Sequence, residues 1–229
     1  WTPSFLLNYD DFETISYSSK AKEAVLEPFK KSLNKVLNNE SISLPFCGLL
    51  DRYPRLLEDL DLDWIVSMEH KGPKFSRTFE TFVGGPGART ALHSAWDNNL
   101  FIQIYGQKTW LIWPPEITFA VKPDATRRLY HKSTYDIYDE NSNEHFPLMK
   151  YFDFYEAQLS PGDVLFNPSG YWHDVTAQTQ SISVGCRWVS PFSVRKNPMQ
   201  HILTMLATDP SIFEKQIHQP SLADYQKTL

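Results

Sequence analysis

Cysteine is scarce in this sequence of 229 residues, which contains only Cys47 and Cys186, too few for a disulfide framework. This scarcity fits a reducing compartment, so we expect a cytoplasmic location. Long apolar runs are also missing. Stretches such as 100–104 have the length of a strand and fall short of the roughly 20 residues that a membrane helix needs. No signal-peptide pattern is found, and because the chain starts at Trp1, we expect further residues upstream.

An excess of positive charge is missing as well. Lys and Arg number 22 and Asp and Glu 27, for a net charge of −5, which argues against tight nucleic-acid binding. There is no P-loop, dinucleotide fingerprint or nucleophile elbow, and the glycines at 84–87 lack the spacing of a phosphate loop. With 41% hydrophobic, 14% aromatic and 21% charged residues, the composition is that of a globular protein.

The first third of the chain is predicted to be mostly helical. Apolar residues recur at helical spacing from Leu26 to Leu37, with Pro28 in a first turn that tolerates it. The segment 53–60, with the sequence YPRLLEDL, predicts a second, short helix. Each helix is expected to bury one apolar face against the rest of the fold.

From Arg77 onward, short strands separated by turn residues are predicted. We expect these strands at 78–83, 100–105, 108–113, 164–166, 171–176 and 181–189. Gly106-Gln107 predicts a hairpin between two of them. Residues 116–150 are polar and rich in Tyr and His, which predicts a lid or binding surface. Helices are expected again at 199–207 and 211–218.

Regularly spaced short strands predict a small antiparallel barrel. We expect a mainly β (α+β) fold, a double-stranded β-helix of the jelly-roll or cupin type with flanking N- and C-terminal helices. The barrel is placed at residues 77–195, a helical scaffold part at 1–76 and C-terminal helices at 196–229, all within one domain.

Two histidines on predicted barrel strands give the first indication of chemistry. His93 follows the turn at 84–87, and His173 follows the turn at 167–170. Two imidazoles on neighbouring strands can converge on one metal ion, and an iron ion that activates O2 needs such ligands together with open coordination positions. Lys108 in an apolar strand is a second indication, because a buried ammonium is costly without a partner.

These residues belong to a longer pattern in the sequence. Its members are Thr90, His93, Asn99, Gln103, Gly106, Lys108, Pro114-Pro115, the run 162–168 and the run 171–173. The pattern resembles the JmjC/cupin-type iron(II)- and 2-oxoglutarate-dependent oxygenases, particularly the compact asparaginyl-hydroxylase-like members. The resemblance covers most of the chain and is most specific in residues 84–115 and 160–188.

The resemblance implies a site and its cofactors, Fe(II), 2-oxoglutarate and O2. It implies that His93 and His173 bind the metal ion. It also implies that Lys108 pairs with the distal carboxylate of 2-oxoglutarate, helped by Thr90, and that Asn99 lies beside this cosubstrate. Five further residues are candidates for the substrate pocket, because they lie next to these motifs, in the long loop or in the last strand. They are Trp96, Asp97, Tyr130, His131 and Arg187.

The sequence departs from the family pattern at the third metal ligand. The family's His-x-Asp/Glu motif reads His93-Ser94-Ala95 here. Residues i and i+2 share a strand face, and Asn99 keeps the family's spacing after His93, so Ala95 occupies the carboxylate position. A second Asn of the family, in the last strand, is also missing, and this part of the chain leads to Gly185.

Four interpretations of the missing carboxylate stay open. In the first, chloride fills the position, as in halogenases that carry Ala or Gly there, and halogen is transferred to the substrate. In the second, the protein is a hydroxylase in which water, Asp97 or an Asp→Ala change explains the gap. In the third, His131 or His145 completes a three-histidine dioxygenase site. In the fourth, the barrel is a degenerate binding module.

Retention of Thr90, Asn99 and Lys108 favours an active enzyme. The substrate class stays open between small molecule, peptide and protein, because the residues of the long loop contain no known substrate-recognition motif. The predicted C-terminal helices resemble a segment through which some relatives dimerise, so a homodimer is expected.

Overall fold

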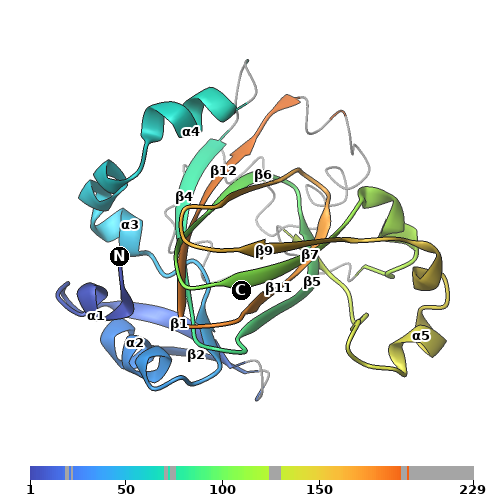
Figure 1. The fold of residues 1–229 in the computed structure, drawn as a ribbon, viewed down its shortest axis with the longest axis horizontal. Coiled ribbons are helices and arrows are strands. Elements are labelled where there is room, and N and C mark those ends of the chain that lie inside the picture. The colour runs from blue at the N-terminus through green and yellow to red at the C-terminus, as the bar shows by residue number, and fades with distance from the viewer. Residues whose placement is uncertain are drawn as a thin grey trace.

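The computed structural model describes residues 1–18, 21, 23–69, 72, 76–123, 130–191 and 195. Two antiparallel sheets face each other at the centre of the molecule (Figure 1). The seven-stranded sheet has the order β10-β6-β12-β4-β3-β1-β2, and the five-stranded sheet has the order β8-β5-β11-β7-β9. This arrangement confirms the predicted mainly β, jelly-roll fold with flanking helices.

The strands are β1 (Glu13–Ser18), β2 (Glu23–Pro28), β3 (Ile42–Leu44), β4 (Ser76–Gly84), β5 (Arg89–Ala95), β6 (Asn98–Tyr105), β7 (Lys108–Trp113), β8 (Tyr130–Lys132), β9 (Tyr155–Leu159), β10 (Val164–Asn167), β11 (Trp172–Ala177) and β12 (Ser181–Val189). The α-helices are α1 (Pro3–Leu6), α2 (Phe29–Leu37), α3 (Leu49–Arg52), α4 (Leu62–Met68) and α5 (Ser142–His145). The 3-10 helices are η1 (Pro54–Asp59), η2 (Pro115–Phe119) and η3 (Met149–Tyr151).

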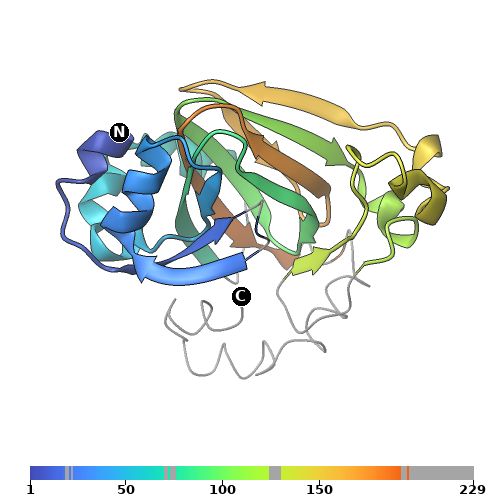
Figure 2. The same cartoon turned by 90° about the horizontal axis from the view of Figure 1, so that it is seen from below.

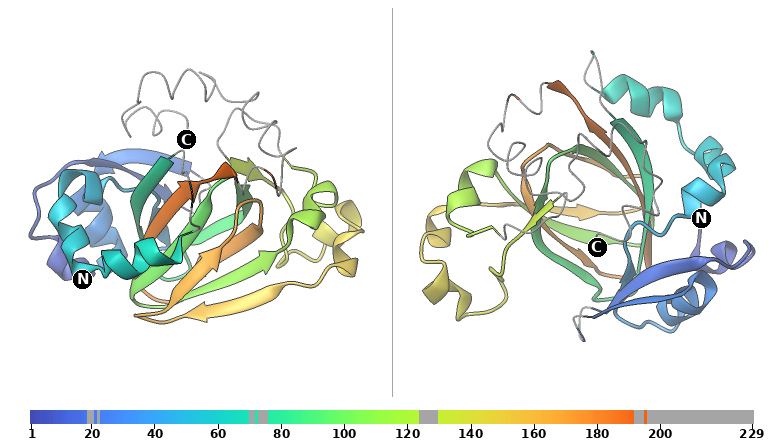
Figure 3. Two further views of the ribbon diagram at one scale, coloured as in Figure 1. Left: turned by 90° about the horizontal axis from the view of Figure 1, so that it is seen from above. Right: turned by 180° about the vertical axis from the view of Figure 1, so that it is seen from behind.

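The two sheets enclose an interior that includes an apolar cluster, and other elements cover parts of their outer faces. Phe101, Trp110 and Leu159 pack together between the sheets. The N-terminal elements cover the seven-stranded sheet, and the segment around η2, α5 and η3 covers part of the five-stranded sheet (Figure 2). Figure 3 shows these two coverings on opposite sides of the barrel. The barrel interior is therefore the place where strands from both sheets can bring side chains together.

The prediction of a mostly helical first third is confirmed at α2 and wrong for residues 13–28 and 42–44. Three strands, β1 to β3, extend the seven-stranded sheet, and Leu26 is an exposed residue of β2 rather than the start of a helix. The helix begins at Phe29, because Pro28 has an extended backbone, with φ −57° and ψ 136°. The predicted helix at 53–60 is the 3-10 helix η1.

The predicted hairpin at Gly106-Gln107 is also wrong. β6 belongs to the seven-stranded sheet and β7 to the five-stranded one, so this turn crosses between the sheets. Gly106 has a φ of +68°, and a Cβ atom there would collide with the carbonyl oxygen of Gln180. A glycine turn that joins two strands of one sheet has the same sequence pattern as a glycine turn that crosses between two sheets.

The other predicted strands are confirmed: 78–83 lies in β4, 100–105 in β6 and 108–113 in β7, while the last strand matches β12 at 181–189. Residues 115–151 contain η2, β8, α5 and η3, none of which was predicted from the sequence. The helices expected at 199–207 and 211–218 lie outside the described residues. Within the described part of the chain, no helix is long and apolar enough to cross a membrane.

Candidate metal and cosubstrate site

The two histidines predicted as metal ligands lie side by side on adjacent strands. His93 on β5 pairs directly with His173 on β11, and their ring centroids are 4.1 Å apart. Burial lowers the pKa of His93 to about 4. Burial and then the neighbouring His93 lower the pKa of His173 well below its ordinary value. Both rings are therefore neutral at pH 7, the form in which imidazole binds metals.

Each ring is oriented by a carbonyl group two residues earlier in the chain. The Nδ1 atom of His93 lies 3.0 Å from the Ala91 carbonyl oxygen, and that of His173 lies 3.1 Å from the Tyr171 carbonyl oxygen. We assign the ring protons to Nδ1 on this basis, so the Nε2 atoms keep their lone pairs for a metal ion. Trp110 stacks on His173 with 5.0 Å between ring centroids and holds its plane.

Ala95 lies on the same face of β5 as His93 and brings no ligand atom. It is buried, and its cross-strand partner Tyr130 meets the His93 ring edge-on at 5.9 Å between centroids. Within the described residues, no three His, Cys, Asp or Glu side chains form a group that could hold a metal ion. The described part of the chain therefore offers a site with two imidazoles.

Lys108 is a buried cation without a partner among the described residues. Its exposed fraction is 7%, and its Nζ atom lies 5.1 Å from the centroid of the Phe101 ring and 5.9 Å from that of the Phe82 ring. Burial lowers the pKa of Lys108 to about 7. A buried ammonium without an anion is unfavourable, so this position fits the binding of a carboxylate from outside the chain.

Asn99 on β6 carries a second unsatisfied group. Its exposed fraction is 3%, and its Oδ1 atom has no hydrogen-bond partner among the residues that the structure describes. Gly185 on β12 makes room for this amide, because a Cβ atom there would lie 2.9 Å from Asn99 Oδ1. The absence of a side chain at Gly185 therefore lets the Asn99 amide lie against β12.

Asn167 joins the site although sequence analysis did not identify it. It pairs with Asn99 across β10 and β6, and its side-chain amide lies 3.3 Å from His173 Nδ1. Its position in a turn motif, Asn-Pro-Ser-Gly, indicated only a turn. The strand register is what reveals its place beside the histidine.

Thr90 reaches the inner face through an irregularity in β5. The register of β11 against β5 shifts between His173 and Val175, so that Thr90 pairs with Val175 and shares the face of the two histidines. Without this bulge, strand alternation would place Thr90 on the opposite face from His93. Thr90 is exposed, in contrast to Asn99 and Lys108.

Arg187 binds carboxylates of the protein itself inside the barrel. Its Nη1 atom donates to Glu80 Oε2 at 3.1 Å, and its Nε atom lies 3.4 Å from Asp97 Oδ2. Burial and the nearby Asp97 raise the pKa of Glu80, partly opposed by Arg187, to about 7. The sequence predicted Arg187 and Asp97 as candidates for the substrate pocket but did not predict Glu80. A single glutamate in a strand gives no sign of which face of the sheet it lies on.

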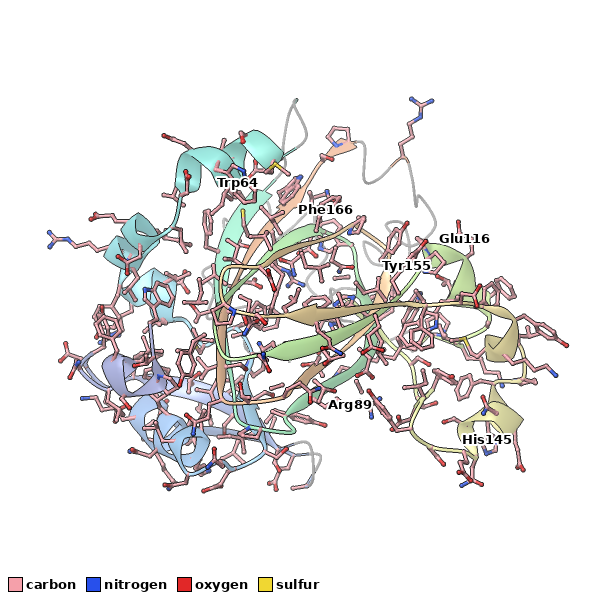
Figure 4. The ribbon with its side chains drawn as sticks, in the orientation of Figure 1. Trp64, Arg89, Glu116, His145, Tyr155 and Phe166 are labelled. Atoms are coloured by element: carbon pink, nitrogen blue, oxygen red, sulfur yellow. The ribbon has the colours of Figure 1, made fainter. Side chains whose placement is uncertain are left out.

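The three-histidine interpretation is wrong for the described structure. His131 on β8 pairs with Ser94, so it faces away from His93, which pairs with Lys132. His145 ends α5 and is exposed at the outer end of the long segment (Figure 4). Of the other pocket candidates, Trp96 is half-buried and its carbonyl oxygen accepts from Ser169 Oγ at 2.6 Å.

Comparison with known proteins agrees with this architecture. The family model described as Cupin-like domain matches residues 7–194. This chain belongs to the cupin-like domain family. Jumonji C domain-containing protein 5 of Drosophila melanogaster is 25% identical over 181 residues, which cover 79% of this cupin-like chain and 45% of the relative. Lysine-specific demethylase 8 of Danio rerio is 31% identical over 146 residues, covering 61% and 34%.

The cupin-like chain spans less than half the length of these two curated relatives. Among solved structures, YcfD, a ribosomal oxygenase from Escherichia coli in complex with cobalt and 2-oxoglutarate, matches with a TM-score of 0.51 and 12% identity. That match covers 87% of the cupin-like chain and 49% of the YcfD chain, and it shows a shared fold.

Proposed function

We propose that this cupin-like domain binds iron(II) and 2-oxoglutarate and is an oxygenase. One observation carries the proposal: the same barrel interior holds two neutral, adjacent imidazoles and a buried lysine that lacks an anion among the described residues. The names of the relatives support it, since they include lysine-specific demethylases and a ribosomal oxygenase with cobalt and 2-oxoglutarate.

Each residue of the site has a stated task in this proposal. His93 and His173 would hold the metal ion through Nε2, and Lys108 would pair with the distal carboxylate of 2-oxoglutarate. The amide of Asn99 would lie beside this cosubstrate, in the space that Gly185 leaves. When bound, iron(II) and 2-oxoglutarate supply O2 reduction and the oxidation of a substrate C–H bond.

Hydroxylation is the reaction that we propose first, on a peptide or protein substrate. The names of the relatives favour this class over a free small molecule, since they include lysine- and arginine-specific demethylases. Halogenation is a second candidate, favoured by one observation, the buried methyl group of Ala95 where the family has a carboxylate. Chloride at this position would replace both the charge and the ligand.

An anaerobic absorbance titration of the purified chain with iron(II) and 2-oxoglutarate tests the proposal. We expect a visible charge-transfer band that His93→Ala and His173→Ala abolish. The matched control is His145→Ala, because His145 is exposed on α5, and it should leave the band unchanged. A band that shifts with chloride supports halogenation, and a band that ignores chloride supports hydroxylation. If the wild-type chain gives no band, the proposal is wrong and a non-catalytic interaction module takes its place.

A further inference from the structure

The outer face of the seven-stranded sheet carries a groove of about 640 Å³ between helix α4 and the edge strand β10. Leu165 of β10 packs inside the barrel, so strand alternation places Val164 and Phe166 on the outer face. Leu100 of β6, which packs against Ile65 of α4, lies at the buried bottom of the groove. The groove is therefore on the opposite face of β10 from the candidate metal site.

Three large apolar side chains around this groove are about half exposed. Trp64 and Met68 of α4 are 42% and 54% exposed, and Phe166 of β10 is 50% exposed. Trp64 and Met68 stand one helical turn apart and share a face of α4. Figure 4 shows Trp64 and Phe166 on the same side of the molecule. Exposed apolar groups that gather around a groove are typical of a surface that another protein covers.

Strand β10 lies at the edge of its sheet. Among the strands that the structure describes, it pairs with β6 alone. The backbone N–H and C=O groups on the outer side of an edge strand can pair with a further strand. An extended segment added there directs every second side chain to the outer face, next to Trp64 and Met68. The strand edge and the apolar groove thus fit one extended segment.

Two exposed aspartates, Asp61 and Asp163, also line the groove. Asp61 Oδ1 accepts the Trp64 backbone N–H at 3.0 Å, and Asp163 Oδ2 accepts the Ser160 backbone N–H at 2.8 Å. The second oxygen of each carboxylate takes no part in these two bonds. The described residues that line the groove include no Lys or Arg. Charge complementarity therefore favours a segment that carries Lys or Arg beside its apolar side chains.

We propose that the groove between α4 and β10 binds an extended segment of a partner protein that has apolar side chains at every second position and Lys or Arg at its ends. The segment pairs with β10 as a further strand. Its apolar side chains pack against Trp64, Met68 and Phe166, and its basic groups meet Asp61 and Asp163. This binding needs no metal ion or 2-oxoglutarate, so the inference goes beyond the proposed function and can fail without it.

Fluorescence anisotropy of a set of labelled octapeptides with the full chain, without metal, tests this inference. Each probe has Lys at both ends and Val, Leu, Ile or Phe at every second position, with Thr between them. Trp64→Ser and Met68→Ser should each weaken binding by about 10-fold, because a few large side chains carry most of the energy of an interface. The matched control is Val66→Ser, at an exposed position of α4 outside the groove, which should change the dissociation constant less than about 2-fold.

The charges and the strand pairing are tested separately. The double variant Asp61→Asn, Asp163→Asn keeps both oxygens that accept backbone N–H groups and should weaken binding by about 5-fold at physiological salt. Its control is Asp63→Asn, at an exposed position of α4 outside the groove, with an effect below about 2-fold. Methylation of every second peptide nitrogen should abolish binding for one of the two alternate sets and spare the other, since only one set faces β10.

Several results overturn the inference while the proposed function stands. They are the absence of binding of every probe to the wild type, equal affinities of Trp64→Ser and Val66→Ser, and equal binding of the two methylated sets. A wild-type dimer that Trp64→Ser converts to monomers in sedimentation also overturns it, because a second copy of the chain then covers the groove. Thermal midpoints check that the variants fold, and if Trp64→Ser does not fold, Met68→Ser decides in its place.

Discussion

The buried position that we propose for cosubstrate binding by Lys108 also lowers the stability of the fold. Its ammonium is buried against aromatic rings without an anion among the described residues. We therefore predict that Lys108→Met, of similar length and without charge, raises the free energy of unfolding at pH 7 by at least about 1 kcal/mol. The same variant should lose 2-oxoglutarate binding. Urea unfolding and a 2-oxoglutarate titration measure the two effects.

The pH dependence of the free energy of unfolding tests the buried state of Lys108 separately. Its pKa falls from an ordinary 10.5 to about 7 in the folded chain, so the unfolded chain binds more protons between these values. The free energy of unfolding of the wild type should therefore rise with pH above 7, by up to about 1.4 kcal/mol per unit from this group. Lys108→Met should remove that slope, and Lys150→Met, at an exposed lysine, should keep it. An unchanged slope in Lys108→Met contradicts the argument.

At the residue scale, site residues can be found from the sequence when their type is unusual among their sequence neighbours. A lysine in an apolar strand and a histidine after a glycine turn stand out without a structure, but the roles of His93, His173 and Lys108 were predicted from the resemblance to the oxygenase family. Glu80 and Asn167 have no such contrast with their neighbours. Their places follow from which strands pair and in which register, and that is a long-range property.

At the scale of elements, strand positions were predictable and sheet membership was not. Alternation and turn residues act locally, and β12 was predicted with its exact ends. Whether β6 and β7 pair with each other depends on contacts with β10, β12 and β11, which are far away in sequence. The turn at Gly106 was therefore mistaken for a hairpin, and the three N-terminal strands for part of a helical region.

One ion-pair cluster ties the long segment to the strand that carries His173. The Arg89 guanidinium binds Asp174 on β11, with Nε 2.8 Å from Oδ1, and Asp136 in the segment before α5, with 2.9 Å between Nη1 and Oδ2. Arg89 lies at the start of β5, on the rim of the barrel (Figure 4). Asp174 is 2% exposed, so the loss of Arg89 leaves a buried carboxylate without this cation.

We predict that Arg89→Ala lowers the free energy of unfolding by about 3 kcal/mol, since breaking a buried pair strands the other charge. Arg89→Lys should recover only part of this loss, because an ammonium cannot match the two-sided guanidinium contact. Urea unfolding of the three chains measures both differences. A loss below about 1 kcal/mol for Arg89→Ala would show that the cluster behaves like an exposed surface pair.

At the scale of the whole molecule, the N-terminal layer and the barrel share one apolar core. Leu33 and Val36 of α2 and Leu44 of β3 pack with Val83 of β4 and Ile182 of β12, all of them at most 1% exposed. The histidines lie on one sheet, and Asn99, Asn167 and Arg187 lie on the other. The site therefore depends on how the two sheets face each other, and the N-terminal layer supports the back of one of them.

The sequence predicts one domain, and deleting residues 1–68 tests that prediction. The shortened chain would expose Val83, Ile182 and Val184 to water along the back of the seven-stranded sheet. We expect it to lose its cooperative thermal transition in circular dichroism and to bind a hydrophobic dye. The control is Leu33→Ala in the full chain, which should keep one transition and lose about 2–5 kcal/mol. A site built between two sheets keeps its affinity only if both sheets keep their relative positions. A shortened chain that unfolds cooperatively and binds Co(II) as tightly as the full chain would therefore mean that the barrel is a domain by itself.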